Sequence, residues 1–391
     1  MAPSPVNVAP PGPTSLPDTG LGRGWEPVVL LGVTLTLLAF GLVTLYSAST
    51  FLAHRAGVPD YYFVLRQAAG GALGLGVLVV CSRIPYRWWR PLAWPLLIMS
   101  WILLLVLVLP GTEEIAPRIN GARRWLKIGI TLQPSELAKI ALIIWTAALA
   151  VKKQAHFRSL RRGLLPFLVV WTAVLLPIAV EPDFSTACLI GLLVGTVVFV
   201  AGGRPGHFVF LGLLLLPFVR AQLGADWRLR RMTAFLHPEV DPAGAGFQLR
   251  QSLVALGSGG LTGVGFGEGR QKFGFLPEPH NDFIFAMVGE EWGLMGVLFL
   301  LSLYLVLVLV GFRIAARADD LFGELLAVGF TSLIALHALL HMGVGLGLVP
   351  TTGLALPLVS YGRSNLLVTM AAVGILMAVA RETRHGGSHV R

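Results

Sequence analysis

Long runs of apolar residues alternate with short polar connections along most of the chain. A run of about 20 residues is enough to cross the ~30 Å hydrocarbon core of a membrane as a helix. The runs lack the alternating polar positions of membrane-spanning strands, which excludes a β-barrel. The pattern therefore predicts an all-α polytopic membrane protein with about ten transmembrane helices. These are expected near residues 27–46, 63–81, 92–110, 134–151, 165–180, 185–201, 206–219, 283–311, 323–347 and 365–381.

The polar segments divide the chain into one membrane domain and two tails. Residues 1–26 are rich in proline and glycine, which predicts a disordered cytoplasmic tail. Residues 27–381 are expected to form the transmembrane domain, and residues 382–391 a second cytoplasmic tail. Two connections, 111–133 and 220–282, exceed the usual length, and long connections in compact proteins often carry function. Residues 220–282 are expected to be a large extracytoplasmic loop between the seventh and eighth helices.

Charge is scarce, and its distribution indicates how the chain lies in the membrane. Only 13% of the residues are charged, and the formal net charge is +10. In a membrane protein this favours anionic lipid as the partner, and no nucleic acid is expected. Lysine and arginine are concentrated in alternate short connections, which predicts that both termini are cytoplasmic (N-in, C-in).

Two loops on the far side are basic as well, and two interpretations of them stay open. Long loops are translocated whatever their charge, which accounts well for 220–282 and less well for the shorter 111–133. Alternatively, the cations gather on the outer face to hold an anionic ligand. The cations concerned are Arg118, Arg123, Arg124, Lys127, Arg220, Arg228, Arg230, Arg231, Arg250, Arg270 and Lys272.

The stretch from Gly257 to Gly293 combines a glycine-rich run, a polar segment and the start of an apolar helix. Its glycines follow no strand, so a re-entrant or hinge segment fits better than a nucleotide loop. Asp282 lies at the helix start, where an ionisable residue is a candidate functional residue. Partial burial would raise its pKa, as suits a general base. Asp282 is equally interpreted as a plain N-cap, and Glu278 and His280 are alternative bases.

A second polar group precedes and enters the fourth apolar run. Arg123, Arg124 and Trp125 lie before the run, and Glu136 and Lys139 lie in its first turns. The last two are three residues apart, so they share a helix face and are expected to pair. The pair is interpreted either as a structural ion pair that lowers the cost of burial or as part of a site for phosphate and sugar. Trp125 is expected to stack on a sugar or to lie in the interfacial aromatic belt.

Four further acids lie in or beside apolar runs. The turn with Glu181 and Asp183 is interpreted either as a divalent-cation site or as a helix stop followed by a helix cap. Glu290 and Glu291 lie within the eighth apolar run. Because lipid cannot solvate a charge, these two side chains must face protein, water or cations.

Signals for a metal site or a disulfide are weak. His337 and His341 are four residues apart, as in metal-binding helices, but no third ligand is evident. Cys81 and Cys188 both fall in apolar runs, so they indicate neither a disulfide framework nor a metal site.

Several short motifs occur together in a fixed order over nearly the whole chain after residue 27. They include Gly-Ala-Arg-Arg-Trp at 121–125, Gln-Pro-Ser-Glu-Leu-Ala-Lys at 133–139, Asp-Phe-Ile-Phe-Ala at 282–286 and Gly-Leu-Ala-Leu-Pro-Leu-Val-Ser-Tyr-Gly at 353–362. Segments 46–49, 182–184, 248–269, 275–278 and 289–291 belong to the same set. Together they resemble the SEDS family (shape, elongation, division and sporulation). The resemblance implies a peptidoglycan glycosyltransferase of the bacterial cytoplasmic (inner) membrane, with its active site facing outside.

The resemblance also implies substrates, partners and site residues. The expected substrate is lipid II, a disaccharide-peptide carried on undecaprenyl diphosphate, and the product is undecaprenyl diphosphate-linked glycan. The expected partners are a class B penicillin-binding protein, which is a transpeptidase, and other divisome or elongasome proteins. The family's essential acid falls on Asp282. Its other sensitive positions fall on Arg123, Trp125, Glu136, Lys139, Asp183 and Glu290.

The chemistry implied by this family explains why such residues are needed. Making a β-1,4 link from an α-linked lipid diphosphate inverts the anomeric carbon, and one base, expected to be Asp282, must take the acceptor proton. Cations must hold the leaving diphosphate. A divalent cation, Mg²⁺ or Mn²⁺, is expected to assist, with Asp183 and Asp282 as candidate ligands, and no organic cofactor is expected. The substrate-binding residues are expected to be Arg123, Arg124, Trp125, Glu136, Lys139, Arg270, Lys272 and Glu290.

The chain departs from the family's usual pattern at a few positions. Residues 362–365 read Gly-Arg-Ser-Asn instead of Gly-Gly-Ser-Ser, and Arg363 is expected to add a phosphate contact or to mark a divergent pocket. Glu181 stands where glutamine is usual, and His341 stands where asparagine is usual.

Two other functions are kept as alternatives, a lipid II flippase and a scaffold of the division or elongation machinery. A transporter should expose charged residues near the bilayer midplane, whereas here they cluster on the outer side, apart from Lys139, Glu290 and Glu291. A scaffold would not need a base and a set of cations. The proline-rich tail and residues 41–47 favour a division role over an elongation role.

Overall fold

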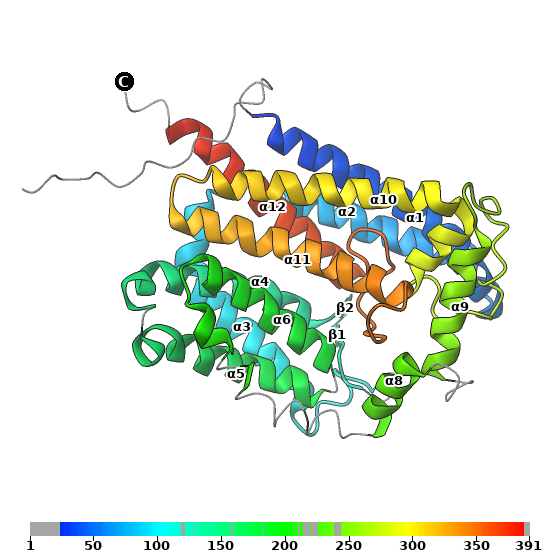
Figure 1. The fold of residues 1–391 in the computed structure, drawn as a ribbon, viewed down its shortest axis with the longest axis horizontal. Coiled ribbons are helices and arrows are strands. Elements are labelled where there is room, and N and C mark those ends of the chain that lie inside the picture. Colours follow the sequence, from blue (N-terminus) through cyan, green and yellow to red (C-terminus); the bar gives the residue numbers. More distant parts are fainter. Residues whose placement is uncertain are drawn as a thin grey trace, which may run out of the picture.

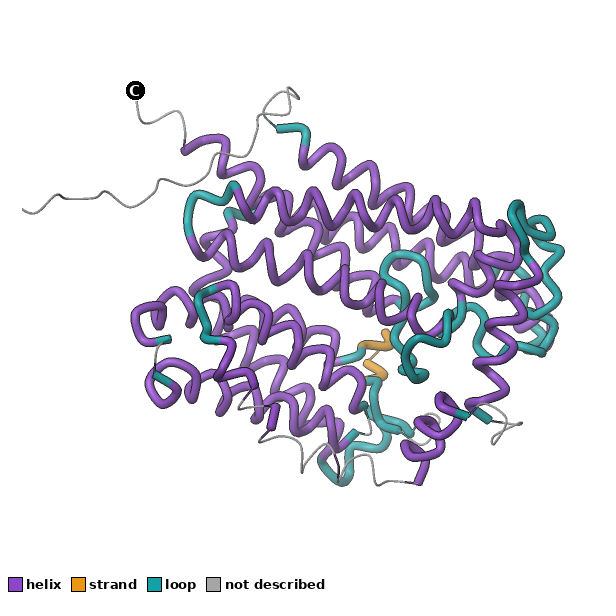
Figure 2. Tube along the Cα trace, in the orientation of Figure 1, coloured by secondary structure: helices purple, strands orange, loops and turns teal. Residues whose placement is uncertain are grey.

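Long helices run side by side through the molecule and form its bundle (Figures 1 and 2). The computed structural model describes residues 24–118, 122–128, 130–157, 159–181, 183–209, 212–213, 220, 226–237 and 244–386. The helices are α1 (Glu26–Arg55), α2 (Tyr62–Arg83), α3 (Trp89–Val108), α4 (Pro134–Lys153), α5 (Leu165–Val180), α6 (Phe184–Val200), α8 (Asp226–Leu236), α9 (Ala245–Ser258), α10 (Ile284–Ala316), α11 (Leu321–Gly345) and α12 (Arg363–Gly386). Two strands, β1 (Leu126–Ile128) and β2 (Ile130–Leu132), pair antiparallel.

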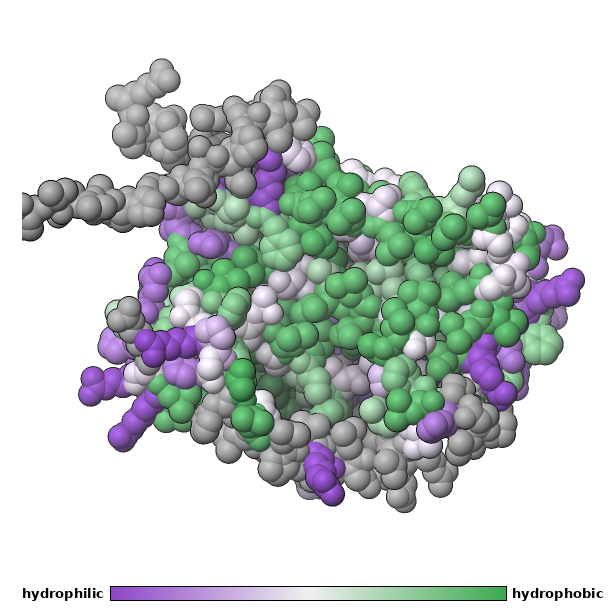
Figure 3. All heavy atoms as spheres, in the orientation of Figure 1, coloured by the Kyte–Doolittle hydropathy of each residue, from purple (hydrophilic) through white to green (hydrophobic). Residues whose placement is uncertain are grey.

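The structure contains the predicted membrane helices wherever it describes the chain. Within the described residues, 8 helices are long and apolar enough to span a membrane, and Phe184–Val200 is a shorter apolar helix. These correspond to all the predicted helices except the seventh, because most of residues 206–219 lie outside the described part. Figure 3 shows apolar side chains over the middle of the bundle and hydrophilic ones gathered toward its ends. The chain is therefore a multi-pass membrane protein, as predicted.

Both ends of the described chain lie at one end of the bundle, as the predicted topology requires (Figure 1). There Arg317, at the end of α10, donates to the Glu26 carboxylate at 2.9 Å. The backbone N–H of Tyr86 donates to Glu382 of α12 at 2.9 Å. The opposite end, here called the loop end, carries residues 109–118, 122–128, 130–133, 181, 183, 244–283 and 346–362.

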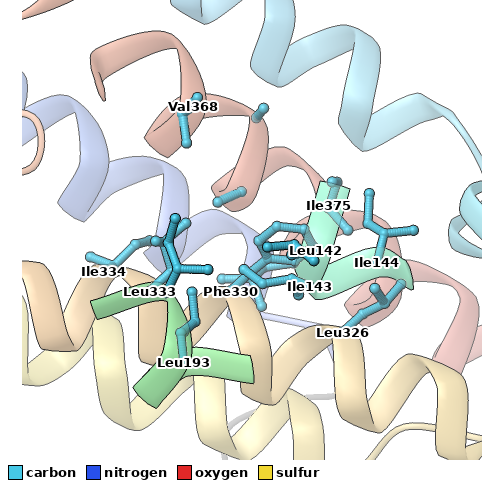
Figure 4. Packing of buried hydrophobic residues seen from close by; sticks show 14 of the residues in the cluster. Leu142, Ile143, Ile144, Leu193, Leu326, Phe330, Leu333, Ile334, Val368 and Ile375 are labelled. Atoms are coloured by element: carbon cyan, nitrogen blue, oxygen red, sulfur yellow. The ribbon is translucent and has the colours of Figure 1, made fainter. Parts of the chain in front are cut away.

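The hydrophobic core lies where α4, α6, α11 and α12 meet. Figure 4 shows Ile143, Leu193, Phe330 and Ile375 packed together there, and each is completely or almost completely buried. In α4 and α11, 78% of the apolar stretch is buried, against 28% in α2 and α3. The two central helices are thus largely surrounded by protein, whereas α2 and α3 face outward.

The long loops contain more regular structure than the sequence predicts. Residues 220–282, expected to be a loop, include α8 and α9. Residues 111–133 include the hairpin β1–β2, whose register pairs Leu126 with Leu132. The sequence does not predict these elements because helices of 14 residues or fewer and strands of three residues carry little periodicity.

The glycine-rich run closes a break in α10. Gly293 has φ 63° inside this helix, so nearby backbone groups lose their helical partners. Residues 260–265 replace those partners: Val264 N–H donates to the Glu290 carbonyl at 2.9 Å, and Leu294 N–H donates to the Gly260 carbonyl at 3.0 Å. A side chain would not fit, because a Cβ on Gly263 would lie 2.1 Å from the Glu291 carbonyl oxygen.

This close approach predicts different outcomes for two neighbouring glycines. Gly263 and Gly267 both have positive φ (84° and 82°), but a Cβ on Gly267 meets nothing within 4 Å. Gly267→Ala should cost about 1 kcal/mol, because only its left-handed backbone is strained. Gly263→Ala adds an overpacking cost of about 1–3 kcal/mol.

Unfolding of both variants in detergent would measure this difference. Equal stabilities of the two variants would show that the run does not pack against the break in α10.

Candidate active site at the loop end

Asp282 lies two residues before the start of α10 and does not cap it. The capping position is Phe283, and no side chain accepts a hydrogen bond from the first turn. The interpretation of Asp282 as a plain N-cap is therefore wrong. Its Oδ1 atom is shielded from solvent and has no hydrogen-bond partner within the described part of the chain. A shielded acceptor without a partner is unusual in proteins and requires an explanation.

Backbone contacts between two loops fix the position of Asp282. The N–H groups of Asn281 and Asp282 both donate to the Glu278 carbonyl at 3.1 Å, in a turn where Glu278 has φ 50°. From the loop between α11 and α12, the Ser360 hydroxyl donates to the Asn281 carbonyl at 2.7 Å. A Cβ on Gly353 would lie 3.7 Å from Asp282 Oδ2, so this second loop forms a wall beside the carboxylate.

Gln67 of α2 holds the second loop in place, a role that the sequence does not predict. This buried side chain donates to the Ser360 carbonyl at 2.9 Å and accepts from the Gly362 N–H at 3.2 Å. The sequence shows only one amide in an apolar run. The role follows from a contact that spans almost 300 positions of the chain, which no local pattern contains.

Two arginines from different loops lie in the electrostatic surroundings of Asp282. The pKa of Asp282 is raised to about 6, first by burial and then by Glu278, and Arg231 and Arg124 oppose the rise. Arg231 belongs to α8, and one of its guanidinium nitrogens lies 3.5 Å from the Thr351 carbonyl oxygen. The basic loops 111–133 and 220–282 thus each bring a cation to the acid, which favours the ligand-holding interpretation for these two residues.

His280 packs in a cluster of aromatic rings. Its ring centroid lies 5.5 Å from that of Phe63 and 5.8 Å from that of Tyr361. Burial lowers the pKa of His280, and only Glu278 acts in the opposite direction. The Glu278 side chain is 55% exposed and lies 3.7 Å from His280.

Glu136 and Lys139 form the predicted pair within a larger buried network. The ammonium of Lys139 lies 2.7 Å from Glu136 and 3.0 Å from Nε2 of His337. Asn365 lies 3.2 Å from the other ring nitrogen of His337 and 3.5 Å from Glu136. Lys139 is completely buried. The network therefore ties α4 to α11 and α12, which favours the structural interpretation of the pair.

His337 and His341 do not form a metal pair. Both ring nitrogens of His337 are occupied by Lys139 and Asn365, and Nδ1 of His341 lies 2.7 Å from the Leu354 carbonyl. The His337 ring is thus held by α4 and α12, and the His341 ring by the loop between α11 and α12.

Glu290 and Glu291 face protein, as predicted, and anchor the glycine-rich loop. Glu290 accepts from the N–H of Arg270 at 2.8 Å. Lys272 lies 3.0 Å from Glu291 and donates to Ser47 of α1 at 2.7 Å. The Arg270 side chain is exposed, whereas Lys272 is buried. The contacts of Glu290 and Lys272 are thus with the glycine-rich loop, Glu291 and α1, and neither Arg270 nor Lys272 is among the charges that shift the pKa of Asp282.

A cleft of about 470 Å³ lies where α3 and α5 reach the loop end, and Arg123 and Glu181 line it. Arg123 forms an ion pair with Glu113 and donates to the Leu109 carbonyl at 3.4 Å. The pKa of Glu181 is raised to about 9, first by burial and then by Asp183, and Arg124 opposes the rise. Arg124 therefore acts on both Glu181 and Asp282.

The remaining predicted residues flank these groups. Trp125 is half-buried directly before β1. Asp183 occupies the N-cap position of α6, where its carbonyl accepts from the Ala187 N–H at 3.1 Å. Arg363 lies 3.4 Å from the Thr131 hydroxyl, and its stem packs on Gly70. The Arg363 side chain, which stands where the family usually has glycine, thus connects α12 to β2 and α2.

Comparisons with known proteins agree on one group. The FtsW/RodA/SpoVE family, described as cell cycle proteins, matches residues 28–385. A protein of Geobacter metallireducens named probable peptidoglycan glycosyltransferase FtsW is 43% identical over 355 residues, covering 90% of this chain and 94% of the relative. Stage V sporulation protein E of Bacillus subtilis is 41% identical over 363 residues, which cover 92% of this chain and 98% of that protein.

Solved structures agree with this result. A chain from a peptidoglycan synthase complex that coordinates polymerization and crosslinking superposes with a TM-score of 0.76 at 29% identity. It covers 93% of this chain and 99% of that one. The rod shape determining protein RodA of Thermus thermophilus superposes with a TM-score of 0.66 at 30% identity. The match covers 93% of this chain and 99% of RodA.

The buried network predicts a strong coupling between Glu136 and Lys139. Removing one partner of a buried ion pair leaves an uncompensated charge and costs about 3–5 kcal/mol. Lys139→Met and Glu136→Gln should each destabilise the protein to this extent, whereas the double variant should recover most of the loss. A double-mutant cycle of unfolding in detergent would measure the coupling.

The exposed pair Arg87–Asp320, 3.5 Å apart, provides the control. The coupling energy between Arg87 and Asp320 should be at most about 1 kcal/mol in the same kind of cycle. Additive losses at Glu136 and Lys139 would contradict a coupled pair.

Proposed function

The chain belongs to the SEDS family of FtsW, RodA and SpoVE cell cycle proteins and is a peptidoglycan glycosyltransferase, and we propose that it polymerises lipid II with Asp282 as the general base. The observation that carries this proposal is the shielded Oδ1 of Asp282, which has no partner in the described residues and lies near two arginines. An acceptor of this kind is available for a proton from a substrate.

The proposed step begins when Asp282 takes the proton from the acceptor sugar hydroxyl. The freed oxygen forms a bond to the anomeric carbon of the donor, and the bond from that carbon to the lipid diphosphate breaks with inversion. The proton then resides on Asp282, and undecaprenyl diphosphate leaves. A pKa of about 6 suits this role, because the carboxylate is mostly ionised at neutral pH yet is a stronger base than ordinary aspartate.

Arg124 and Arg231 are proposed to stabilise the charge that develops on the leaving diphosphate. Guanidinium groups bind phosphate oxygens through two parallel hydrogen bonds, and their charge is fixed at all relevant pH values. Lys139, enclosed by Glu136 and His337, is proposed to position α4 rather than to contact the diphosphate. Trp125 is proposed to bind sugar, and Arg123 is proposed to bind diphosphate.

A divalent cation fits this site only in part. Within the described residues, no group of three or more His, Cys, Asp or Glu side chains could enclose a metal. Mg²⁺, however, is commonly held by one or two carboxylates together with substrate phosphates. Asp282 would hold such an ion, with Asp183 as a second candidate, and the bound ion would neutralise charge on the diphosphate.

We further propose that the loop end faces outward across the bacterial cytoplasmic membrane and that the chain acts in division. The asymmetry of lysine and arginine supports this orientation, and several of the most similar relatives are named FtsW. The similar chain from a synthase complex supports a class B penicillin-binding protein as partner. The proposed base, Asp282, lies at the loop end and not in the middle of the bundle, which favours chemistry at the membrane surface over transport through the membrane.

Replacing Asp282 tests the base directly. Asp282→Asn keeps the shape of the side chain but cannot accept a proton, so lipid II polymerisation should fall about 10²–10⁴-fold. Glu278→Gln, which changes an exposed carboxylate in the same turn, is the control and should keep activity within a few fold. Gel analysis of glycan made by the purified proteins with their transpeptidase partner would measure both. Full activity of Asp282→Asn would refute the assignment.

The pKa of Asp282 predicts the acid limb of the pH profile. The base must be ionised, so kcat/KM should be constant above about pH 7 and fall roughly tenfold per pH unit well below the pKa of about 6. Arg231 lowers this pKa, so Arg231→Gln should move the limb to higher pH. Initial rates between about pH 5 and 8 would measure the shift. A limb that stays in place would exclude Arg231 from the site.

A further inference from the structure

The cleft at the ends of α3 and α5 has an apolar wall and a polar wall. The apolar wall includes Leu107, Val108 and Val180, which end two membrane-spanning helices. Val108 is 39% exposed and Val180 is 59% exposed, so the wall continues into the lipid-facing surface. The indole N–H of Trp101 donates to the Ala173 carbonyl at 2.9 Å and holds the two helices together below the cleft. An amphiphile with its chain in the membrane fits such a site better than a water-soluble ligand.

The polar wall contains two buried groups without partners. Oε1 of Glu181 and Nε of Arg123 are both shielded from solvent, and neither has a hydrogen-bond partner in the described part of the chain. Glu181 is only 5% exposed. An unsatisfied buried polar group is costly, so a phosphate group that accepts from Arg123, and from Glu181 in the protonated form that its raised pKa favours, would recover that cost. Arg118 also lines the cleft and adds a second guanidinium.

The cleft is connected electrostatically to the proposed catalytic base. Arg124 acts on Glu181 at the cleft and on Asp282 across the loop end. Arg123 is its neighbour in the chain and faces the cleft. Asp282 does not line the cleft, so a phosphate held in the cleft would occupy a different place from the proposed site of sugar transfer.

We propose that this cleft binds the diphosphate head of a lipid-linked substrate or product, with Arg123 as its main contact and the isoprenoid chain along α3 and α5. The inference rests on the proposed function, because polymerisation needs two lipid-linked molecules on the enzyme at once. The cleft provides a second place for a lipid diphosphate while the first occupies the site of Asp282.

Photocrosslinking locates the ligand directly. Intact protein in nanodiscs is incubated with undecaprenyl diphosphate that carries a photoreactive group next to the diphosphate, and crosslinked peptides are mapped by mass spectrometry. The expected crosslinks are to the peptides that contain Val108 and Val180. Arg123→Gln should reduce them at least about tenfold, the effect of losing one charge-assisted hydrogen bond. Val180→Trp fills the cleft without changing a charge and should reduce them as well.

Matched controls separate this inference from the proposed function. Arg55→Gln removes an exposed arginine at the loop end outside the cleft and should leave the crosslinks unchanged. Asp282→Asn should also keep them while abolishing polymerisation, so the two proposals fail independently. Thermal unfolding confirms that each variant is folded.

Competition identifies the source of the bound phosphate. Unlabelled undecaprenyl diphosphate should displace the probe, whereas phosphatidylglycerol and inorganic diphosphate should not. Equal displacement by phosphatidylglycerol would overturn the inference and indicate a general phospholipid site. Displacement by inorganic diphosphate would overturn the role of the isoprenoid chain. Unchanged crosslinks in both Arg123→Gln and Val180→Trp would show that the cleft is not the binding site of the lipid diphosphate.

Discussion

A charge buried in a membrane bundle needs a partner within the protein, and this constraint explains where most of the polar residues lie. Lys139 meets Glu136 inside the core, and Lys272 meets Glu291 under the glycine-rich loop. Through further contacts with His337 and Ser47, respectively, these two lysines connect elements that are far apart in the chain. Asp282 differs, because one of its oxygens is shielded and unpartnered in the part that the structure describes. A group kept in this costly state is a common feature of functional sites.

The backbone around the break in α10 explains how a loop residue is held firmly enough for catalysis. The glycine-rich run packs against the break at distances that exclude side chains. The ion pair of Lys272 with Glu291 fixes the same segment to α10. On the other side, Ser360 and Gln67 attach the turn before α10 to α2. Asp282 therefore lies between two anchored loops, although it belongs to no helix.

Arg124 relates the two polar sites at the loop end. It opposes the rise in pKa of both Glu181 and Asp282, so it lies within electrostatic reach of both carboxyl groups. A polymerase must hold a donor and an acceptor that both carry lipid diphosphates. A cation shared by the carboxylate proposed as the base and an amphipathic cleft is an arrangement suited to that task.

The sequence by itself determined the fold class, the positions of the membrane helices and the candidate acid. Apolar runs of spanning length can be accommodated in lipid only as helices, and an isolated Asp282 at a helix start is visible in the chain. The pairing of Glu136 with Lys139 was also predictable, because three residues separate them on one helix. Only the tertiary structure decided that Asp282 does not cap α10, that Arg124 and Arg231 join it, and that Lys272 and Glu290 anchor a loop elsewhere. Those choices depend on contacts between residues distant in the chain, and local periodicity contains no information about them.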